Sequence, residues 1–343
     1  MYITHLNSIY SNETTLIDYV PYPQRVHQVS DGGIRVAQGI KILPSEFVEY
    51  LLAGSQGATT RSLDILRGIV AARGKTGLIL ATGGSVWTGY GTTIPLTNKY
   101  PKHRMLPLGM TQIYAGQLAN KLGGVDYVST DTTSCISAHS ALHHAKLLID
   151  SSRLDRVIVV SSDNGASEEY MHFFGEQGLC LLESDGVDAN KFRLGQGANI
   201  TVVESPTSLK QTKNTPLAKV HDINIVSETH SNPLGIAPTG IGYRKAITSI
   251  LTPAMVSSIN FVKTHSTYSD DNQVECEVVK ELLGNMPTVN YKKKIGHTMG
   301  PSAAIEMHLA MGDRKGTFLS LGAGMGNVFA AAIVETLDAF TEE

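Results

Sequence analysis

Hydrophobic and polar positions along the chain follow two periods, and the change from one to the other predicts strands that lead into helices. Residues 125–133 alternate and are rich in Val and Thr, as β-strands are. From Ala138 to Ile149 the apolar residues recur at helical spacing. Cys135 lies where the first pattern changes into the second. A thiol at a helix N-terminus lies among unpaired N–H groups, so we expect this environment to favour the nucleophilic thiolate.

The same order of landmarks occurs twice: a strand, a turn leading into a helix, and two further strands. In the first half these are 77–84, the Cys135 turn, 156–163 and 198–205. In the second half they are 259–266, the His297 turn with its helix at 301–312, 317–324 and 327–335. Strands alternating with helices predict an α/β fold with largely parallel sheets covered on both faces.

This repeat suggests two domains, residues 1–205 with the thiol and residues 206–343 with two histidine motifs, with the polar segment 206–220 as a connector. It places the Cys135 turn opposite the His297 turn, so that both helix N-termini point toward one place. The additional segments 85–115 and 164–195 of the first half are expected to form a pocket wall and subunit contacts.

Composition narrows the function. The chain has 343 residues, 42% of them hydrophobic and 17% charged, which suits two closely packed domains with a large core. A net charge of −3 gives no indication of nucleic acid or an anionic membrane as a partner. Three widely spaced cysteines form neither a disulfide framework nor a zinc pattern, and the sequence shows no signal peptide and no membrane span. We therefore expect a cytoplasmic protein.

Taken singly, the candidate residues have ordinary interpretations. A free cysteine is usually a small buried side chain, and we keep that interpretation for Cys180 and Cys276. His265 follows a strand and His297 lies in a glycine-flanked turn, where each alone is more often structural. The run Lys292 to Lys294 alone is typical of a solvated surface.

Together, these motifs resemble the β-ketoacyl-acyl carrier protein synthases, which are condensing enzymes of the thiolase fold with a Cys-His-His set. The matching segments are TTSC at 132–135, THSTYSDDNQVE at 264–275, KKKIGHTMGPSAAIE at 292–306 and LGAGMGN at 321–327. The strand GQGANITVVES at 195–205 is a fifth match. The resemblance implies a thiolase-like layered αβαβα fold made of two duplicated halves.

The resemblance also implies roles for individual residues. Cys135 would accept an acyl group from a carrier thioester, and His265 and His297 would assist decarboxylation of a malonyl-type extender and stabilise its enolate. Lys292 would support the histidine pair, and Glu275 would anchor the first histidine loop. The backbone N–H groups of Cys135 and Ala323 would form the oxyanion hole. Ala323 replaces a phenylalanine that gates the acyl entrance in elongating members, which suggests an ungated entrance.

The expected partners follow from the same resemblance. They are a phosphopantetheinylated acyl carrier protein, acyl and malonyl thioesters, and a second copy of the chain paired along residues 125–131. Arg61, Arg67, Arg73 and Lys75 are candidates for contacting an acidic helix of the carrier. We expect neither a metal nor a cofactor of the protein's own, because the substrates would be carried on phosphopantetheine or coenzyme A.

Four alternatives remain open. An acyltransferase or thioester hydrolase on the same scaffold would keep Cys135 without condensing, and a non-catalytic partner subunit of a ketosynthase normally lacks the cysteine. A dehydrogenase would use Gly322, Gly324 and Gly326, but these lie between two strands instead of between a strand and a helix. Zinc binding by His139 and His143 would have no third ligand nearby.

Overall fold

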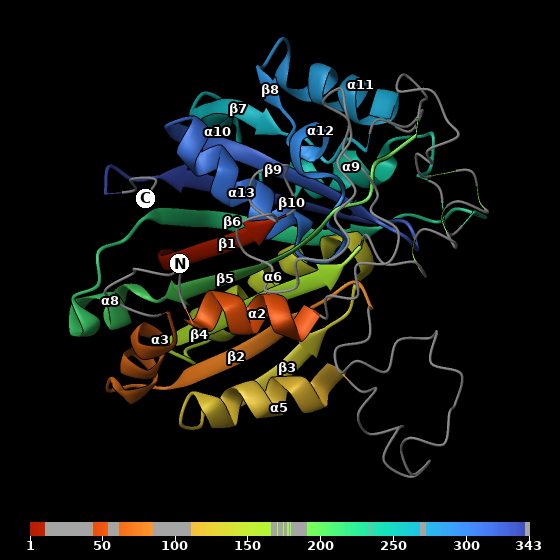
Figure 1. Ribbon diagram of the computed structural model, residues 1–343. Helices are drawn as coiled ribbons and strands as arrows, with labels where there is room; N and C mark the ends of the chain where they lie inside the picture. The colour runs from red at the N-terminus through yellow and green to blue at the C-terminus, as the bar shows by residue number, and fades with distance from the viewer. Residues whose placement is uncertain are drawn as a thin grey trace, which may run out of the picture.

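A computed structural model of the chain describes residues 1–10, 44–53, 62–84, 111–165, 191–232, 236–267 and 272–339, together with Tyr170, Phe174, Gln177, Leu179 and Leu234. Cys180, Arg61 and the segment 85–110 lie outside these described residues. Figure 1 shows the strands stacked as one twisted sheet with helices on its faces.

The sheet has ten strands in the order β3-β2-β4-β5-β1-β6-β10-β9-β7-β8. The first half supplies β1 (Tyr2–Tyr10), β2 (Thr76–Ala81), β3 (Tyr127–Asp131), β4 (Arg156–Asn164) and β5 (Gln196–Glu204). The second half supplies β6 (Ala218–Ser227), β7 (Ile259–Lys263), β8 (Thr288–Val289), β9 (Gly316–Gly324) and β10 (Val328–Thr336).

Each half uses its strands in the same way. The strands β2, β3 and β4 are parallel, and so are β7, β8 and β9. In each half an antiparallel strand follows, β5 or β10, and then the half's first strand, β1 or β6. A short antiparallel pairing, Tyr2 with Lys219 and Ile3 with Ala218, joins β1 to β6. The repeated order of strands expected from the sequence is therefore present.

The ten helices of the described residues lie in three layers or in connections between strands. They are α2 (Pro44–Ala53), α3 (Ser62–Ala71), α5 (Thr111–Lys121), α6 (Ser137–Asp150), α8 (Pro206–Thr212), α9 (Ile241–Thr248), α10 (Pro253–Val256), α11 (Asn272–Leu283), α12 (Lys292–Ile295) and α13 (Ser302–Asp313).

Three hydrophobic clusters define the layers. The central cluster joins alanines of α6 and α13 to inward-facing residues of both halves of the sheet, such as Val157 and Phe318. A second cluster packs α2, α3 and α5 against the first half, and a third packs α9 and α11 against the second half. Small side chains let α13 and one face of α6 lie buried between the two half-sheets, whereas Leu147 and Asp150 on the other face of α6 are exposed. The arrangement is the predicted five-layered αβαβα fold.

Two predictions about chain organisation need correction. The segment 206–220 is not a simple connector, because α8 occupies Pro206–Thr212 and β6 begins at Ala218. The strands β1 and β6, which form the centre of the sheet, were not predicted. In β1 the apolar positions Ile3 and Ile9 are separated by polar residues, including His5 and Asn7, so the alternation is weak.

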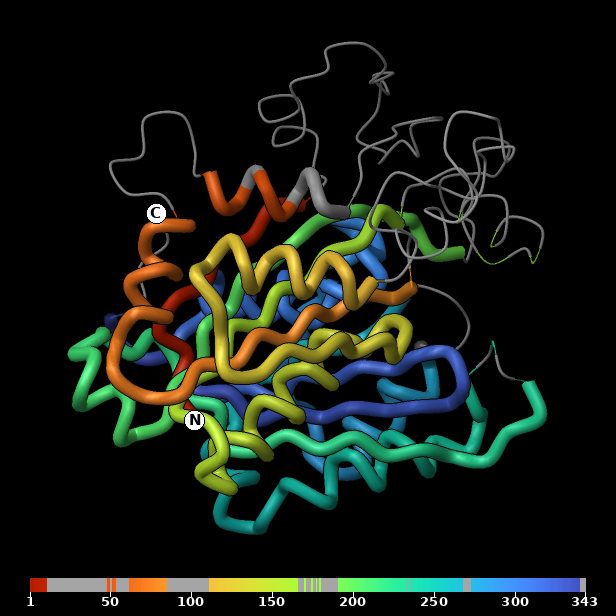
Figure 2. Tube along the Cα trace, turned by 90° about the horizontal axis from the view of Figure 1, so that it is seen from below, coloured from red at the N-terminus to blue at the C-terminus, as the bar shows by residue number. Residues whose placement is uncertain are grey.

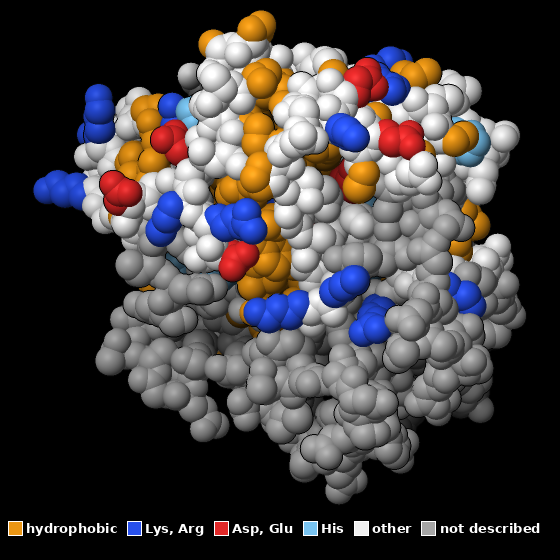
Figure 3. Space-filling model, turned by 90° about the horizontal axis from the view of Figure 1, so that it is seen from above, with side chains coloured by type: hydrophobic (Ala, Val, Ile, Leu, Met, Phe, Trp, Pro, Cys, Tyr) orange, Lys and Arg blue, Asp and Glu red, His pale blue; other side chains and the backbone are white. Residues whose placement is uncertain are grey.

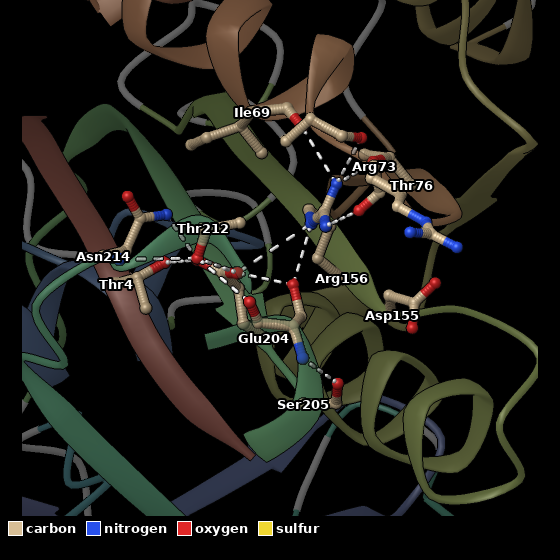
Figure 4. A network of polar contacts seen from close by, with 12 residues as sticks. Thr4, Ile69, Arg73, Thr76, Asp155, Arg156, Glu204, Ser205, Thr212 and Asn214 are labelled. Atoms are coloured by element: carbon tan, nitrogen blue, oxygen red, sulfur yellow. Dashed lines mark hydrogen bonds and ion pairs between the residues drawn. The ribbon is translucent and has the colours of Figure 1, made fainter. Parts of the chain in front are cut away.

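A buried ion pair stabilises the first half near the N-terminal ends of β2 and β4. Arg156 and Glu204 are both 0% exposed, and their side chains approach to 3.8 Å. Arg156 donates to carbonyls at the end of α3, including Ile69 O at 3.1 Å, and Glu204 accepts from Thr4 and Asn214 (Figure 4). Because each charge is surrounded by hydrogen-bonding partners, we interpret this network as structural.

Candidate active site

Cys135 lies on a strained turn at the end of β3. The chain leaves β3 at Asp131, and Ser134 adopts a left-handed φ of 55°, which is unusual for a residue other than glycine. A 3₁₀ turn, Ser134–Ile136, then leads into α6. Ser137 holds the turn, because Thr133 N donates to its Oγ at 2.9 Å and that Oγ donates to Thr82 O at 2.8 Å. Such strain concentrates at functional sites, where the surrounding structure maintains it.

The second half contains a matching turn before α13. Met299 has a φ of 60° and lies three residues before the first residue of α13, as Ser134 does before α6. The two turns touch, since Ala138 N donates to Gly300 O at 3.1 Å. The two turns therefore correspond, as the sequence predicts, and within the His297 turn the counterpart of Cys135 is Gly300. His297 still lies in this turn, beside the entry to α13.

The structure brings His265 and His297 together. Their ring centroids lie 5.5 Å apart, with the ring planes nearly perpendicular. His265 follows β7, and the Glu275 carboxylate holds this turn by accepting from His265 N at 2.6 Å and from Ser266 N at 2.8 Å. His297 N donates to Arg193 O at 2.6 Å, which fixes the second ring against the start of β5.

A chain of buried polar groups sets the orientation of His297. Its Nδ1 lies 3.2 Å from Ser302 Oγ, which donates to Glu306 Oε1 at 2.8 Å. The Lys292 ammonium donates to the same carboxylate oxygen at 2.5 Å. Ser302 donates its only hydroxyl proton to Glu306, so its oxygen accepts a hydrogen bond from His297. His297 is therefore the Nδ1–H tautomer, and its Nε2 is an acceptor. Lys292 therefore reaches His297 through Glu306 and Ser302 and not by direct contact.

The three lysines of the 292–294 run differ in environment. Lys292 is buried, whereas Lys293 and Lys294 are exposed. The sequence pattern alone is typical of a solvated surface, and that interpretation is wrong for the first lysine of the run.

Aromatic residues from the first-half insert enclose Cys135. The thiol packs against a cluster that contains Phe174, Phe192, Leu194 and Met299. The Phe192 ring in turn lies 5.9 Å from the His297 ring, centroid to centroid, so the thiol and the histidine share one wall. The described part of the 164–195 segment therefore does line the site, as expected.

Burial controls the protonation states of this site. It raises the pKa of the Cys135 thiol, although a hydrogen bond from Ser134 and the Lys292 charge act in the opposite direction. The expectation that the helix N-terminus favours the resting thiolate is therefore wrong, because desolvation outweighs it. Burial also lowers the pKa of His297 to about 3 and that of His265 well below 6.5. At neutral pH both imidazoles are neutral, so one can take up a proton.

The glycine-rich strand β9 lies directly against the elbow. A Cβ on Gly322 would lie 2.7 Å from His139 Nδ1, and one on Gly324 would lie 3.7 Å from Cys135 N. In the view from below, the blue β9–β10 hairpin reaches the same side of the molecule as the end of β2 (Figure 2). These glycines belong to a hairpin of two strands, which argues against the nucleotide-loop alternative.

Ala323 faces the other side of β9. It is 3% exposed and belongs to the cluster formed by α9 and α11, together with Leu319 and Leu321. Its side chain therefore does not line the acyl entrance, and the prediction of an ungated entrance at this position is wrong. A role of its backbone N–H in an oxyanion hole stays a prediction.

Other predicted residues lie away from the site or have other partners. His139 Nε2 lies 3.1 Å from Ser320 Oγ and His143 Nδ1 lies 2.8 Å from Ile223 O, so these two rings do not face a common metal position. Cys276 is exposed on α11. Arg73 and Lys75 precede β2, at the end of the sheet opposite to Cys135, which argues against their contacting a carrier that serves this thiol.

Sequence reasoning missed several buried polar residues. Asp163, at the end of β4, accepts from Thr82 Oγ1, Gly83 N and Gly300 N and so ties the end of β2 to the turn before α13. Lys263 and Glu306 are the other important omissions, at 1% and 0% exposure. A signal was available for Lys263, which is the single charge of an otherwise apolar strand, and for Glu306, which is surrounded in sequence by small and apolar residues.

Comparisons with known proteins define the class. A chain from the AntDE:AntF complex, a type II polyketide acyl carrier protein with its ketosynthase, superposes with a TM-score of 0.71 and 16% identity, over 98% of this chain and 99% of that chain. The ketosynthase from module 6 of the bacillaene synthase of Bacillus subtilis gives a TM-score of 0.65 and 14% identity, over 85% and 59%. The protein therefore has the thiolase-like fold of ketosynthases.

The sequence comparison agrees with the fold. A putative polyketide β-ketoacyl synthase from Streptomyces cyaneus is 25% identical over 209 residues, which are 56% of this chain and 49% of that protein. The chain thus spans about half the length of the curated relative it matches. No family model matches the sequence. The resemblance to β-ketoacyl synthases is confirmed, and the roles of individual residues stay predictions.

Proposed function

We propose that the protein is a condensing enzyme that acylates Cys135 from a carrier thioester and then joins this acyl group to a malonyl-type extender with loss of carbon dioxide. The observation that carries the proposal is the convergence of a half-buried thiol and His297 on one aromatic wall, with His265 in ring contact with His297. On this proposal residues 1–205 form the half with the nucleophile and residues 206–343 the half with the histidines.

The acylation step needs a base, because the resting thiol is protonated. Each neutral imidazole has one unprotonated ring nitrogen that can accept, such as Nε2 of His297, whose Nδ1–H is held by Ser302. The thiol proton passes to such a nitrogen while sulfur bonds to the acyl carbon, and the carrier thiolate leaves and takes up that proton. Acylation therefore does not depend on one ring alone. Neutral histidine is suited to this task, because an imidazolium has no free lone pair.

The condensation step develops negative charge. Loss of carbon dioxide from the extender leaves an enolate, which attacks the acyl carbon on Cys135 and releases the Cys135 thiolate, which then takes up a proton from solvent. An N–H group of the His265 imidazole and backbone N–H groups at the elbow stabilise an enolate without neutralising it, whereas the Nδ1–H of His297 is held by Ser302. The buried Lys292 adds a positive field. This chemistry uses no cofactor or metal of the protein's own.

An acyltransferase or hydrolase that stops after acylation is the second candidate. It would need Cys135 and one base, whereas the structure supplies two histidines in ring contact and a dedicated carboxylate for the loop of each, Glu275 for His265 and Glu306 for His297. The second histidine with its own anchor favours condensation.

The decisive experiment separates the two steps. The protein is incubated with acyl-carrier thioesters and analysed by intact mass spectrometry, and carbon dioxide release from malonyl carrier is then measured. We expect one acyl group per chain, absent in Cys135→Ala and retained in Cys276→Ala. His265→Ala or His297→Ala should lower carbon dioxide release by about 10²-fold or more while acylation stays detectable. Acylation without any carbon dioxide release in the wild type would favour the second candidate.

The partners are proposed on the same basis. One structural neighbour is a ketosynthase in complex with an acyl carrier protein. Here α12 carries the exposed Lys293 and Lys294, and the face of the molecule above β8 and α11 shows Lys and Arg side chains along a hydrophobic band (Figure 3). We place carrier docking on this face. The strand β3 ends the sheet, and its edge would pair with a second copy.

No helix among the described residues is long and apolar enough to cross a bilayer. A cytoplasmic location remains part of the proposal.

A further inference from the structure

Lys263 is a buried lysine close to the candidate site that the proposed chemistry has not used. Burial lowers the pKa of its amine, and the Glu306 carboxylate acts in the opposite direction. Lys263 ends β7, two residues before His265, and is 1% exposed. Its Nζ donates to Glu306 Oε2 at 3.1 Å and to Leu321 O at 2.8 Å. Burying a lysine is costly unless it is paired, so a lysine at this position is expected to have a specific purpose.

Glu306 connects Lys263 to the machinery around His297. Lys263 binds one carboxylate oxygen, while Lys292 and Ser302 bind the other. Two ammonium groups thus share one carboxylate, and the cluster around Glu306 carries a surplus positive charge. With both oxygens occupied, the carboxylate cannot rotate, so Ser302 is kept in place to receive His297 Nδ1–H.

The second partner of Lys263 connects it to the nucleophile side. Leu321 immediately precedes Gly322, whose Cα faces His139 on α6. The ammonium therefore joins three elements that meet at the site: the strand that leads to His265, the helix that carries Glu306, and the glycine strand that lies against the Cys135 elbow.

We propose that Lys263 is a positioning residue that acts through Glu306 to hold His297 neutral and oriented, so that the decarboxylation step depends on it more than acylation does. This inference rests on the proposed condensing activity.

The electrostatic surroundings of His297 give the direction of the effect. The charged or titratable groups that face it are Lys263 from β7, His265 after β7, Lys292 from α12 and Glu306 from α13. The two lysines oppose protonation of the ring, and Glu306 favours it. Without Lys263, less positive charge balances the Glu306 carboxylate, so the His297 imidazole should become protonated at a higher pH. A reaction that needs the neutral ring then loses activity at a higher pH.

The test uses Lys263→Met, which keeps most of the aliphatic stem and removes the charge, and Lys263→Arg, which keeps the charge. Arg156→Met is the matched control, because Arg156 is also a fully buried cation bonded to carbonyls but lies at the other end of the sheet. Acylation of Cys135 and carbon dioxide release from malonyl carrier are measured separately across pH, with urea unfolding for each variant.

We expect Lys263→Met to lower carbon dioxide release by about 10- to 100-fold and acylation by less than about 3-fold, as a misplaced catalytic group does. The acidic limb of the pH–rate profile for decarboxylation should move to higher pH by about one unit. This is the pKa shift expected from removing one charge roughly 10 Å away in a partly polar interior. Lys263→Arg should restore part of the loss. Arg156→Met should lower stability and leave the ratio of the two steps unchanged.

A double mutant tests whether the effect passes through Glu306. Adding Lys263→Met to Glu306→Gln should cost little more than Glu306→Gln alone, because residues in one network are not additive. If the effects multiply, or if both steps fall equally with an unmoved pH profile, the positioning role is refuted and Lys263 is only structural.

The inference can also be judged if the proposed activity fails. If wild type releases no carbon dioxide, condensation is refuted, and NMR titration of histidine Cε1–H signals in wild type and Lys263→Met decides on Lys263. An upward shift of a site histidine's pKa in the variant supports the inference, and identical titrations overturn it.

Discussion

The close approach of Gly322 to His139 allows the packing of β9 against α6 to be tested by substitution. In Gly322→Ala the new Cβ would lie 2.7 Å from His139 Nδ1, 2.9 Å from its Cε1 and 3.0 Å from Ile136 Cγ2. The ring cannot move away freely, because His139 is 0% exposed and its Nε2 bonds to Ser320. Overpacking of this kind costs about 1–3 kcal/mol. We therefore expect the free energy of unfolding to fall by that amount.

Urea unfolding followed by circular dichroism measures this change, provided that the slope with urea is unaltered. Gly68→Ala is the matched control, because a Cβ there would meet nothing within 4 Å on the exposed side of α3. In a helix interior this substitution should stabilise the protein by roughly 0.5–1 kcal/mol.

The partner substitution identifies the cause. In a His139→Ala background the new methyl group has room, so the additional cost of Gly322→Ala should largely disappear. If Gly322→Ala is as stable as wild type, or costs the same with and without His139, then β9 does not lie against α6 as described.

Three further predictions concern other parts of the site. Ala323→Phe should lower stability by about 1–3 kcal/mol, since the side chain enters the core beneath α9, and the ratio of acylation by long and short thioesters should stay constant. Lys292→Met should lower the free energy of unfolding by about 3 kcal/mol, because it removes a partner of buried Glu306, whereas exposed Lys293→Met should leave it unchanged in urea unfolding. Burial lowers the pKa of His297 to about 3 from 6.5, so the unfolded chain binds an extra proton between these values. Stability should therefore fall as the pH drops below 6.5, and His297→Gln should reduce that slope.

The sequence was sufficient to locate the elbows, because a change of hydrophobic period and a glycine-flanked turn are local features. The direction in which the Ala323 side chain points could also have been predicted from the sequence. Leu319, Leu321 and Ala323 share one parity, and Ser320 and Gly322 share the other, so strict alternation places Ala323 with the leucines.

Other features depend on contacts between distant segments. The raised pKa of Cys135 arises from aromatic residues of the 164–195 segment, which no local pattern brings to the thiol. The sharing of Glu306 by Lys263 and Lys292 requires three separate elements to meet. The counterpart of Cys135 is Gly300 because of matching backbone angles, and residue types do not reveal these.

The central position of β1 has a consequence for how the chain is made. This first strand pairs with β5 and β6, and Thr4 bonds to Glu204, 200 positions later. During synthesis, which proceeds from the N-terminus, β1 therefore leaves the ribosome long before either neighbouring strand exists. During that interval the backbone N–H and C=O groups along both edges of β1 have no partner strand, so they are exposed to pairing with other nascent chains. A purification tag or fusion placed before Met1 would thus lie next to the middle of the sheet, where β1 and β6 join the two halves.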